Sequence, residues 1–313
     1  MRIIHCRECK PNENGINAQS NVKSAVALGN FDGLHLGHAK LIEEITKRKG
    51  TDSYVYTFKV HPNKFIFDDP SSVRLLIDNE QKIEILAQMG VGHICFEDFE
   101  NVRDMSPADF IKKVLIDTLN CDIAVCGYNF TFGKKGAGNS EFLKSELAKY
   151  GALCIVVDPV TYNGIPVSST RIRSLIESGA VDEAAQLLGR FYAIRRPVLH
   201  GRMLGRTMGI PTVNQSFDDD SVRPANGVYI CRVLVNGEEY PAVCDVGTKP
   251  TVNGKELLAE THIIGYDGNL YGETVEVAFL KRLRTEKKFS DTEELKTVIQ
   301  NDIANAKKYF GIV

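Results

Sequence analysis

The chain has 313 residues, of which 43% are hydrophobic and 25% are charged, and its formal net charge is −2. Because this length exceeds what one hydrophobic core usually serves, we expect two domains. The near-neutral charge argues against a large nucleic-acid footprint, and no apolar run reaches the length of a membrane span, so we expect neither a nucleic-acid nor a membrane partner.

The N-terminus lacks the basic-then-apolar order of a signal peptide, and the sequence therefore predicts a cytoplasmic protein. The 8 cysteines are scattered along the chain, and in a cytoplasmic protein we expect them to be reduced thiols. His5, Cys6 and Cys9 form the one metal-like spacing. A structural zinc site normally needs a second pair of ligands, and none is evident in the sequence.

The first predicted elements are a strand, Ser24 to Leu28, and an amphipathic helix, Ala39 to Lys49, joined by a glycine-rich turn. The glycines let the backbone approach a ligand, and the helix start offers unpaired N–H groups and a positive dipole end. In the turn, His35 and His38 can donate to phosphate oxygens and stabilise the charge of a phosphoryl or nucleotidyl transfer. This order favours a phosphate site over the alternative, a glycine turn with two surface histidines.

After this segment, the first half of the chain alternates between short apolar runs and helical periodicity. Such alternation predicts a Rossmann-like α/β domain, a parallel sheet covered by helices on both faces. Ligands of such sheets bind beyond the carboxyl ends of the strands, where residues 29–38 and 127–138 would both lie. The expected strands are Ser53 to Phe58, His93 to Phe96, Asp122 to Gly127 and Ala152 to Val157, and the expected helices are Gln81 to Met89, Ala108 to Leu119 and Glu141 to Tyr150.

Two later segments carry polar side chains that suit a phosphate site. The loop from Gly127 to Gly138 contains Asn129 and two lysines, although by chemistry alone it is a basic loop with solvated lysines. The run from Val167 to Arg173 begins a helix with three hydroxyls and two guanidinium groups. Hydroxyls are ordinary N-caps, but cationic side chains in a first helical turn oppose the helix dipole unless an anion lies there. The second segment therefore favours a polyphosphate partner.

From Pro197 onward the pattern changes to short alternating segments with turn signals, which predicts a small antiparallel β-barrel. Asn236-Gly237 and Asp267-Gly268 have the composition of hairpin turns. A helical stretch, Ser169 to Leu188, links the halves, so we place the domain boundary near Gly189, with domains at 1–188 and 189–313. The expected barrel strands are Val228 to Val235, Tyr240 to Val246, Glu260 to Ile264 and Glu273 to Leu283, and a helix from about Thr292 to Tyr309 would close the barrel.

The barrel half opens with a glycine-rich run, residues 198–214, in which arginines are interspersed. Gly201, Gly205 and Arg206 could cradle phosphates. A plain glycine-rich hairpin between strands is the alternative.

Several of these segments resemble one family. The turn Gly29-Asn-Phe-Asp-Gly-Leu-His-Leu-Gly-His38 carries the His-x-Gly-His signature of nucleotidyltransferases and is similar to the flavin-adenylating module of bacterial bifunctional riboflavin kinase/FAD synthetases. Gly127 to Gly133 and Val167 to Arg173 resemble two further motifs of that module. Pro211-Thr-Val-Asn214 is similar to the Pro-Thr-Ala-Asn motif of riboflavin kinases. The resemblance covers nearly all of the chain after about residue 20.

For the first domain, the resemblance implies an FMN adenylyltransferase site in which His35 and His38 stabilise the transition state. His61 would reach the nucleotide or the flavin, although a structural role before Pro62 is equally open, and Lys59 and Val60 depart from the family's acidic residue and proline. The implied nucleotide-binding residues are Gly29, Phe31, Gly37, Asn129, Ser169, Thr170 and Arg173, with the last three holding pyrophosphate and Asn129 also contacting flavin.

For the barrel, the resemblance implies a riboflavin kinase. Thr212 and Asn214 would help to hold magnesium and ATP, because neutral oxygens suit magnesium. Glu260 would be the base for the attacking hydroxyl, whereas strand alternation alone would make it an outward-facing residue. Asp245 and Lys249 replace the family's usual Asn and Arg.

Taken together, the resemblance implies an enzyme that phosphorylates riboflavin to FMN with ATP and Mg²⁺ and then adenylylates FMN to FAD with release of pyrophosphate. We expect a monomer or a transient homo-oligomer. One alternative is a protein that keeps only one activity, with Lys59 and Val60, or Asp245 and Lys249, marking the decayed site. The other is a non-catalytic flavin sensor that regulates a partner.

Overall fold

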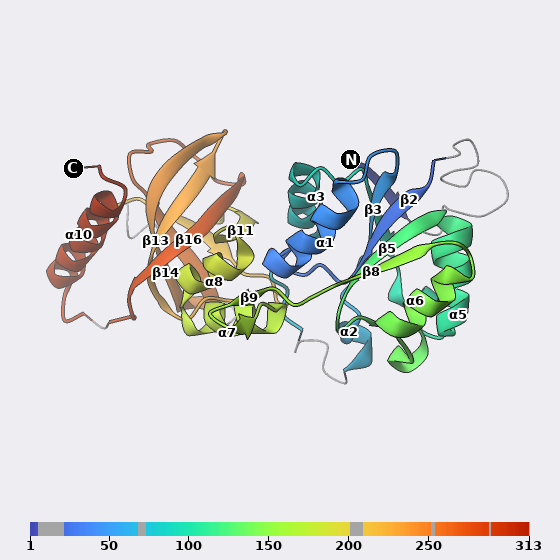
Figure 1. The fold of residues 1–313 in the computed structure, drawn as a ribbon. Coiled ribbons are helices and arrows are strands. Elements are labelled where there is room, and N and C mark those ends of the chain that lie inside the picture. Colours follow the sequence, from blue (N-terminus) through green and yellow to red (C-terminus); the bar gives the residue numbers. More distant parts are fainter. Residues whose placement is uncertain (6–21, 68–72, 201–208, 252–253, 288, 313) are drawn as a thin grey trace. The chain divides into compact units, whose positions relative to one another are not determined.

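The computed structural model describes residues 1–5, 22–67, 73–200, 209–251, 254–287 and 289–312. By its internal contacts, the chain divides into two compact units, Met1–Ser169 and Thr170–Val313 (Figure 1). Each unit has its own sheet and its own core, as the length of the chain predicts.

The first unit is built on a six-stranded sheet in the order β1-β4-β3-β2-β5-β8. All neighbouring strands are parallel, which confirms the predicted α/β architecture. The short strand β1 was not predicted from the sequence. The strands are β1 (Arg2–His5), β2 (Ser24–Leu28), β3 (Asp52–Phe58), β4 (His93–Glu97), β5 (Cys121–Gly127) and β8 (Leu153–Val157).

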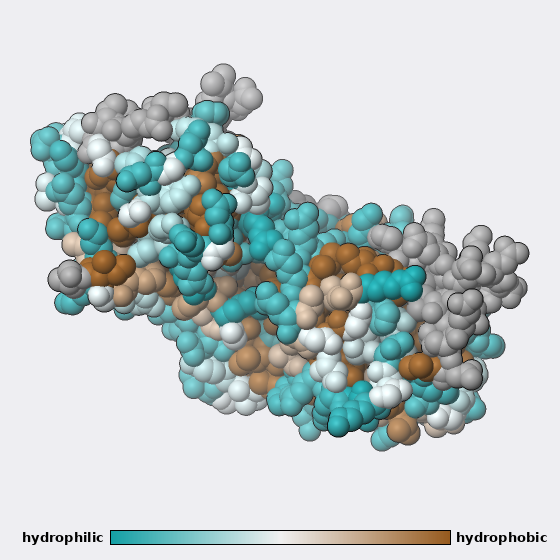
Figure 2. All heavy atoms as spheres, turned by 90° about the horizontal axis from the view of Figure 1, so that it is seen from above, coloured by the Kyte–Doolittle hydropathy of each residue, from teal (hydrophilic) through white to brown (hydrophobic). Residues whose placement is uncertain are grey.

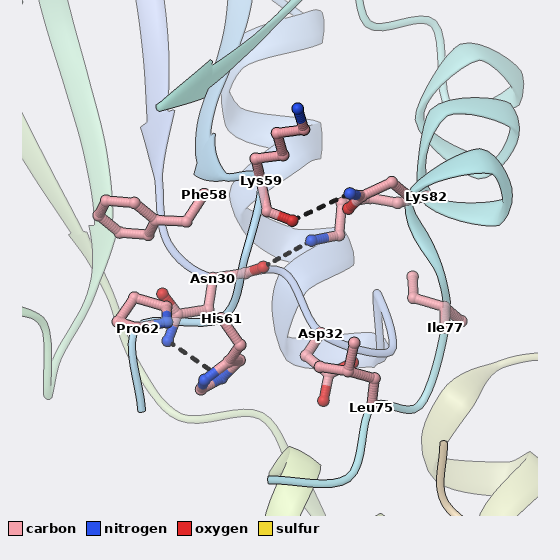
Figure 3. Close-up of a pocket in the computed structure, with 10 residues that line it drawn as sticks. Asn30, Asp32, Phe58, Lys59, His61, Pro62, Leu75, Ile77 and Lys82 are labelled. Carbon is pink, nitrogen blue, oxygen red and sulfur yellow. Dashed lines mark hydrogen bonds between the residues drawn. The ribbon is translucent and has the colours of Figure 1, made fainter. Parts of the chain in front are cut away.

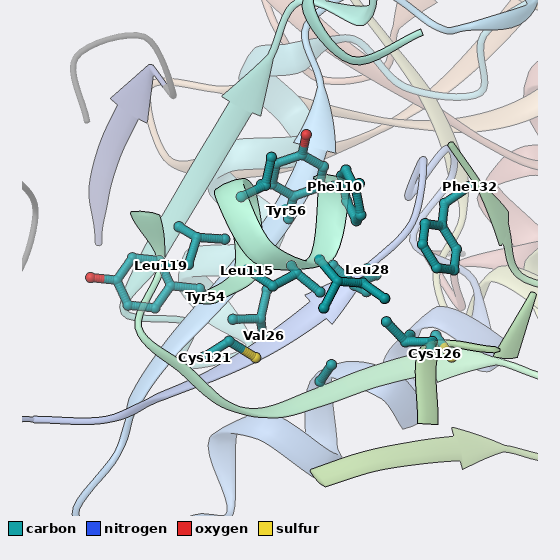
Figure 4. Close-up of a cluster of buried hydrophobic side chains, with 14 of the residues drawn as sticks. Val26, Leu28, Tyr54, Tyr56, Phe110, Leu115, Leu119, Cys121, Cys126 and Phe132 are labelled. Carbon is teal, nitrogen blue, oxygen red and sulfur yellow. The ribbon is translucent and has the colours of Figure 1, made fainter. Parts of the chain in front are cut away.

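Strand β2 shows why this sheet needs a cover on both faces. All five of its residues are buried, and the four apolar ones alternate between two hydrophobic clusters. Val26 and Leu28 face one cluster with Phe110 and Leu115 (Figure 4). Ala25 and Ala27 face the other cluster, which also contains Ile42 and Leu86. A strand buried on both sides reads as a continuous apolar run, which is what the sequence shows.

Helices supply both covers. The π-helix η3 and helix α6 contribute to the cluster of Figure 4, whereas α1 and α3 contribute to the other. The helices of this unit are α1 (Leu36–Thr46), α2 (Asn63–Ile66), α3 (Asn79–Gln88), α4 (Phe99–Val102), α5 (Pro107–Asp109), η3 (Phe110–Thr118), the 3₁₀ turn η4 (Lys134–Gly136) and α6 (Ser140–Ala148). Two small antiparallel pairs complete it, β6 (Thr131–Phe132) with β7 (Gly138–Asn139), and β9 (Thr161–Tyr162) with β10 (Ile165–Pro166).

The second unit is an antiparallel six-stranded sheet in the order β11-β16-β13-β14-β15-β12. An isolated bridge between Leu199 and Asn214 joins the two ends of this sheet, so the predicted barrel is confirmed. Helix α10 packs on β13 and β14 and places Ala306 in the core. The elements are α7 (Ser169–Ser178), α8 (Val181–Leu188), β11 (Tyr192–Pro197), β12 (Val213–Ser216), β13 (Gly227–Val235), β14 (Glu238–Thr251), β15 (Gly254–Ile263), β16 (Thr274–Arg284) and α10 (Thr292–Tyr309).

Two turn predictions had different outcomes. Asn236 and Gly237 have φ of 51° and 83° and join β13 to β14 in a two-residue hairpin, as predicted. The prediction for Asp267-Gly268 was wrong, because β15 and β16 are not neighbours in the sheet. The predicted helical stretch Ser169 to Leu188 consists of two helices, and Gly179 with a φ of 87° lies between them.

The cysteines only partly follow the expectation. Cys121, Cys126, Cys154, Cys231 and Cys244 are free thiols. Cys95 is disulfide-bonded, so the expectation of a reduced thiol was wrong at this position.

In the described part of the chain, no helix combines the length and the hydropathy that crossing a bilayer requires. On the face shown in Figure 2, hydrophilic side chains are interspersed with smaller hydrophobic areas.

Candidate active sites in the two units

The predicted phosphate turn lies between β2 and α1, at the carboxyl end of the sheet. Phe31 and Leu34 have φ of 49° and 40°, a region that bulky residues rarely adopt. The ring of Phe31 lies so close to Gly29 that a Cβ there would be 3.3 Å from it. A side chain at position 29 would therefore push on the turn, which gives a physical reason for this glycine.

His35 and His38 are brought together at the start of α1. His35 is the N-cap, and its Nδ1 accepts a hydrogen bond from the backbone N–H of His38 at 3.3 Å. The two rings stack with centroids 3.7 Å apart. Because Nδ1 of His35 is an acceptor, the proton of the neutral ring lies on Nε2, which leaves that atom as a donor. The first turn of α1 contains no acidic side chain, so the helix dipole there favours an anion.

The loop also has internal supports. Asp32 is buried, and its Oδ1 accepts a hydrogen bond from the backbone N–H of Leu76 at 2.9 Å. The carbonyl of Asp32 accepts one from the hydroxyl of Ser169 at 2.8 Å. Ser169 lies 132 residues after Gly37 in the sequence and was predicted from a separate motif. Its hydrogen bond nevertheless joins it directly to the turn that carries the histidines.

A small pocket adjoins this turn (Figure 3). His61 lines it, and its Nδ1 accepts the backbone N–H of Asn63 at 3.2 Å. Its Nε2 lies 3.5 Å from the side-chain nitrogen of Asn30. The structure thus places His61 beside the glycine turn. The residues lining the pocket are Asn30, Asp32, Phe58, Lys59, His61, Pro62, Leu75, Ile77, Asn79 and Lys82.

The sequence analysis did not single out Lys82, which is a buried cation in this pocket. Its exposure is 6%, and burial lowers the pKa of its ammonium to about 8, partly offset by the nearby Asp32. Its Nζ donates to the carbonyl of Asn30 at 3.1 Å. A signal was present in the sequence, because Lys82 lies four residues before Leu86, on the apolar side of a predicted helix.

The other residues predicted for this site are described in part. Asn129 is exposed in a turn that the Phe130 N–H and the Gly127 carbonyl close at 3.1 Å. Gly37 lies in the first turn of α1. Thr170 and Arg173 lie in the first turns of α7 and belong to the second compact unit. Their grouping with the histidines stays a prediction.

In the second unit, strand register brings two predicted kinase residues together. Asn214 on β12 is directly opposite Glu260 on β15, and Glu260 is directly opposite Asp245 on β14. Residues opposite one another in an antiparallel sheet share a face, so the three polar side chains form one row. Asn214 is buried, whereas Glu260 and Asp245 are partly exposed.

Thr212 precedes β12 and is partly exposed. Next to it, Nδ1 of His262 donates to the carbonyl of Pro211 at 2.8 Å, which ties the Pro-Thr-Val-Asn segment to β15. In the same unit, the rings of His200 and Tyr271 stack with centroids 4.0 Å apart. Gly201, Gly205 and Arg206 lie outside the described residues.

Comparisons with known proteins match each of the two parts of the chain that carry a candidate site. The family model for FAD synthetase matches residues 17–171, and the model for riboflavin kinase matches residues 188–310. The chain is 36% identical over 301 residues to a bifunctional riboflavin kinase/FMN adenylyltransferase of Bacillus subtilis, covering 94% of both chains. It is 32% identical to the protein of the same description from Escherichia coli K12, covering 92% of this chain and 93% of that one.

One solved structure is similar along nearly the whole length. It is a crystal structure described as a macrolide-efflux protein from Streptococcus pneumoniae, with a TM-score of 0.86 and 29% identity. The match covers 98% of this chain and 99% of the other.

Proposed function

The chain belongs to the bifunctional riboflavin kinase/FMN adenylyltransferases, and from this premise we propose which residues carry each of its two reactions. The enzyme uses ATP to phosphorylate riboflavin to FMN. It then transfers the adenylyl group of ATP to FMN, giving FAD and pyrophosphate.

The adenylyl transfer takes place at the turn between β2 and α1. An oxygen of the FMN phosphate attacks the α-phosphorus of ATP, and the bond to the pyrophosphate oxygen breaks. The stacked His35 and His38 donate to the phosphate oxygens on which negative charge builds, and the N-terminus of α1 adds its positive dipole end. No protein nucleophile is needed, since positioning and charge neutralisation supply the catalysis. This stacked pair at a helix start is the observation that carries the assignment.

The remaining residues proposed for this site bind the two substrates. His61 and Asn129 contact flavin, which the place of His61 beside the pocket supports. Gly29 and Gly37 would let the backbone of the turn come close to the nucleotide. The full nucleotide-binding set is Gly29, Phe31, Gly37, Asn129, Ser169, Thr170 and Arg173, of which Ser169, Thr170 and Arg173 hold pyrophosphate.

The kinase reaction takes place at the row of polar residues on the barrel. Glu260 accepts the proton of the riboflavin hydroxyl as its oxygen attacks the γ-phosphorus of ATP, and ADP leaves. The position of Glu260 directly opposite Asn214 supports this role, because it places the base beside a proposed nucleotide contact. Gly201, Gly205 and Arg206 are proposed as phosphate contacts from sequence alone.

Magnesium is the proposed metal of the kinase site. The hydroxyl of Thr212 and the amide oxygen of Asn214 fit it, because Mg²⁺ prefers oxygen ligands and takes several of them from water and substrate phosphates. Asn214 is buried beside a carboxylate, an environment that suits a cation better than an apolar core would. When bound, the metal would neutralise charge on the ATP phosphates.

We further propose functional domains at 1–188 and 189–313 and a cytoplasmic location, where ATP is abundant. The two matched ranges, 17–171 and 188–310, support a boundary near Gly189. Helices α7 and α8 precede that boundary and pack in the second unit, where α8 contacts β16. The compact units divide earlier, after Ser169, so these helices pack with the barrel although they precede the proposed boundary.

A time course tests the whole assignment. Purified protein is incubated with riboflavin, ATP and Mg²⁺, and the three flavins are separated chromatographically. FMN that appears first and is then converted to FAD is the expected result. FMN alone would mean that the first site is silent. No turnover of either riboflavin or FMN would contradict the enzyme and favour a flavin sensor.

A further inference from the structure

Lys82 occupies a place that is costly for a cation. It lies in the first turn of α3, just after the N-cap Asp78, where the helix dipole disfavours positive charge. Its side chain is almost completely buried, and a lysine is rarely buried in this way unless it is paired. A Met or Leu would fill the same space at lower cost. The cost points to a task that requires the ammonium group.

The partner of the ammonium is one backbone carbonyl. The carbonyl of Asn30 accepts a hydrogen bond from Nζ of Lys82 at 3.1 Å (Figure 3). It also accepts one from the hydroxyl of the buried Thr57 at 3.0 Å. Both acceptor sites of that oxygen are therefore used. The peptide after Asn30 is planar and trans, so a fixed carbonyl direction also fixes the direction of the next N–H group.

The next residue is the one whose conformation needs support. Phe31 has a φ of 49°, which a bulky side chain adopts only when its surroundings enforce it. Its ring is fully buried and lies 5.2 Å from the ring of His38. The ring of His38 in turn stacks on His35. A continuous set of contacts thus leads from Lys82 through one peptide group to the two histidines.

We propose that Lys82 is a positioning residue of the adenylyl-transfer site, which fixes the Asn30 carbonyl and so holds Phe31 and the histidine pair in their reactive arrangement. The role rests on the assignment of His35 and His38 to that reaction. The charged or titratable groups around the ammonium are Asp32, which favours its charged form, and Lys59 and His61, which line the same pocket.

The test compares Lys82→Met with Lys82→Arg in the full-length enzyme. The Met variant keeps an unbranched apolar side chain, one atom shorter than that of Lys, and loses the donor. We expect its kcat for converting FMN to FAD to fall by about tenfold to a hundredfold, with KM for ATP and FMN changed much less, because misplacement of catalytic groups acts on the transition state. Lys82→Arg, which keeps a donor and a charge, should recover part of the loss.

The enzyme offers two controls, its kinase activity and an exposed lysine. The kinase activity on riboflavin belongs to the other unit and should stay unchanged in every variant. Lys113→Met makes the same substitution at an exposed lysine of the first unit, one that pairs only with Asp109 at the surface, and should leave both activities unchanged.

A second variant addresses the carbonyl itself. Thr57→Val removes the other donor to the Asn30 carbonyl without changing the size of the side chain. It should lower the same kcat. In the double variant with Lys82→Met, the fold-reduction in kcat should be smaller than the product of the two single reductions, because both changes release the same carbonyl group.

Two results would overturn the proposal. One is a folded Lys82→Met enzyme whose FMN adenylylation keeps a kcat within twofold of the wild type. The other is strictly multiplicative losses from Lys82→Met and Thr57→Val. If Lys82→Met does not fold, full activity in Thr57→Val would overturn it as well. Failure of the site assignment is distinguishable, since a His38 substitution would then also leave FAD formation intact.

Discussion

Asn214 and Glu260 are directly opposite each other on neighbouring antiparallel strands, β12 and β15. Glu260→Gln keeps the shape of the side chain and removes the proposed base. We expect the rate of riboflavin phosphorylation to fall by about a hundredfold or more. The conversion of added FMN to FAD should not change, and both rates can be followed by chromatography of the flavins. An unchanged phosphorylation rate would remove Glu260 from the reaction.

His38→Gln should have the reverse pattern. The variant keeps a polar side chain in the first turn of α1 but loses the ring that stacks on His35. We expect FMN adenylylation to fall by about a hundredfold, the usual effect of displacing one donor from a developing negative charge. Riboflavin should still be converted to FMN at the wild-type rate. Accumulation of FMN without FAD is the direct readout, and continued FAD formation would contradict the site.

The buried Lys82 predicts an unusual relation between stability and pH. Its pKa is lowered from 10.5 to about 8 by burial, with a smaller opposing effect of Asp32. Between these two values the unfolded chain holds more protons on this group than the folded chain does. The contribution of Lys82 to stability therefore rises with pH across this window, and below about pH 8 its charge costs the folded state up to about 3 kcal/mol.

Lys82→Met should accordingly melt no lower than the wild type at pH 7, although it is less active. The difference between the two proteins should shift in favour of the wild type as the pH approaches 10, and calorimetry of the full-length enzyme at several pH values measures it. A difference that does not depend on pH would show that Lys82 is not titrating in the folded state.

Gly227, at the start of β13, predicts a severe steric effect. A Cβ at this position would lie 2.5 Å from the backbone carbonyl of Arg284, and φ is 151°. Gly227→Ala should therefore destabilise the barrel by more than about 2 kcal/mol and reduce kinase activity at elevated temperature. Thermal melting checks this.

Gly237→Ala is the matched control, because φ there is also positive, at 83°, but nothing lies within 4 Å of the added atom. It should cost about 1 kcal/mol. Equal melting temperatures for the two variants would contradict the steric explanation.

The parallel sheet could be predicted from sequence because its strands are buried on both faces. Strands such as β2 and β5 appear as continuous apolar runs, and their limits differ from the predicted ones by at most one residue. Strand β1 has only four residues, and β12, with the sequence VNQS, has little apolar content. These two strands are formed by pairing with their neighbours rather than by local preference.

The candidate sites also differ in whether local sequence or long-range pairing determines them. His35 and His38 are close in sequence and share a helix start, so a local motif predicted them. The opposition of Asn214 and Glu260 depends on register between strands that are 46 residues apart, which a single sequence does not reveal. Lys82 was missed because its importance comes from burial, and burial is a property of the folded unit.

The backbone bridge at Asn214 links closure of the barrel to the proposed kinase site. The N–H of Leu199 donates to the carbonyl of Asn214 at 2.7 Å, and this bond joins the two ends of the barrel sheet. The same residue is the proposed magnesium contact. A chain whose barrel has not yet closed would therefore lack an ordered metal ligand. Phosphorylation of riboflavin would therefore depend on closure of the barrel, whereas the adenylyl-transfer site in the other unit would not.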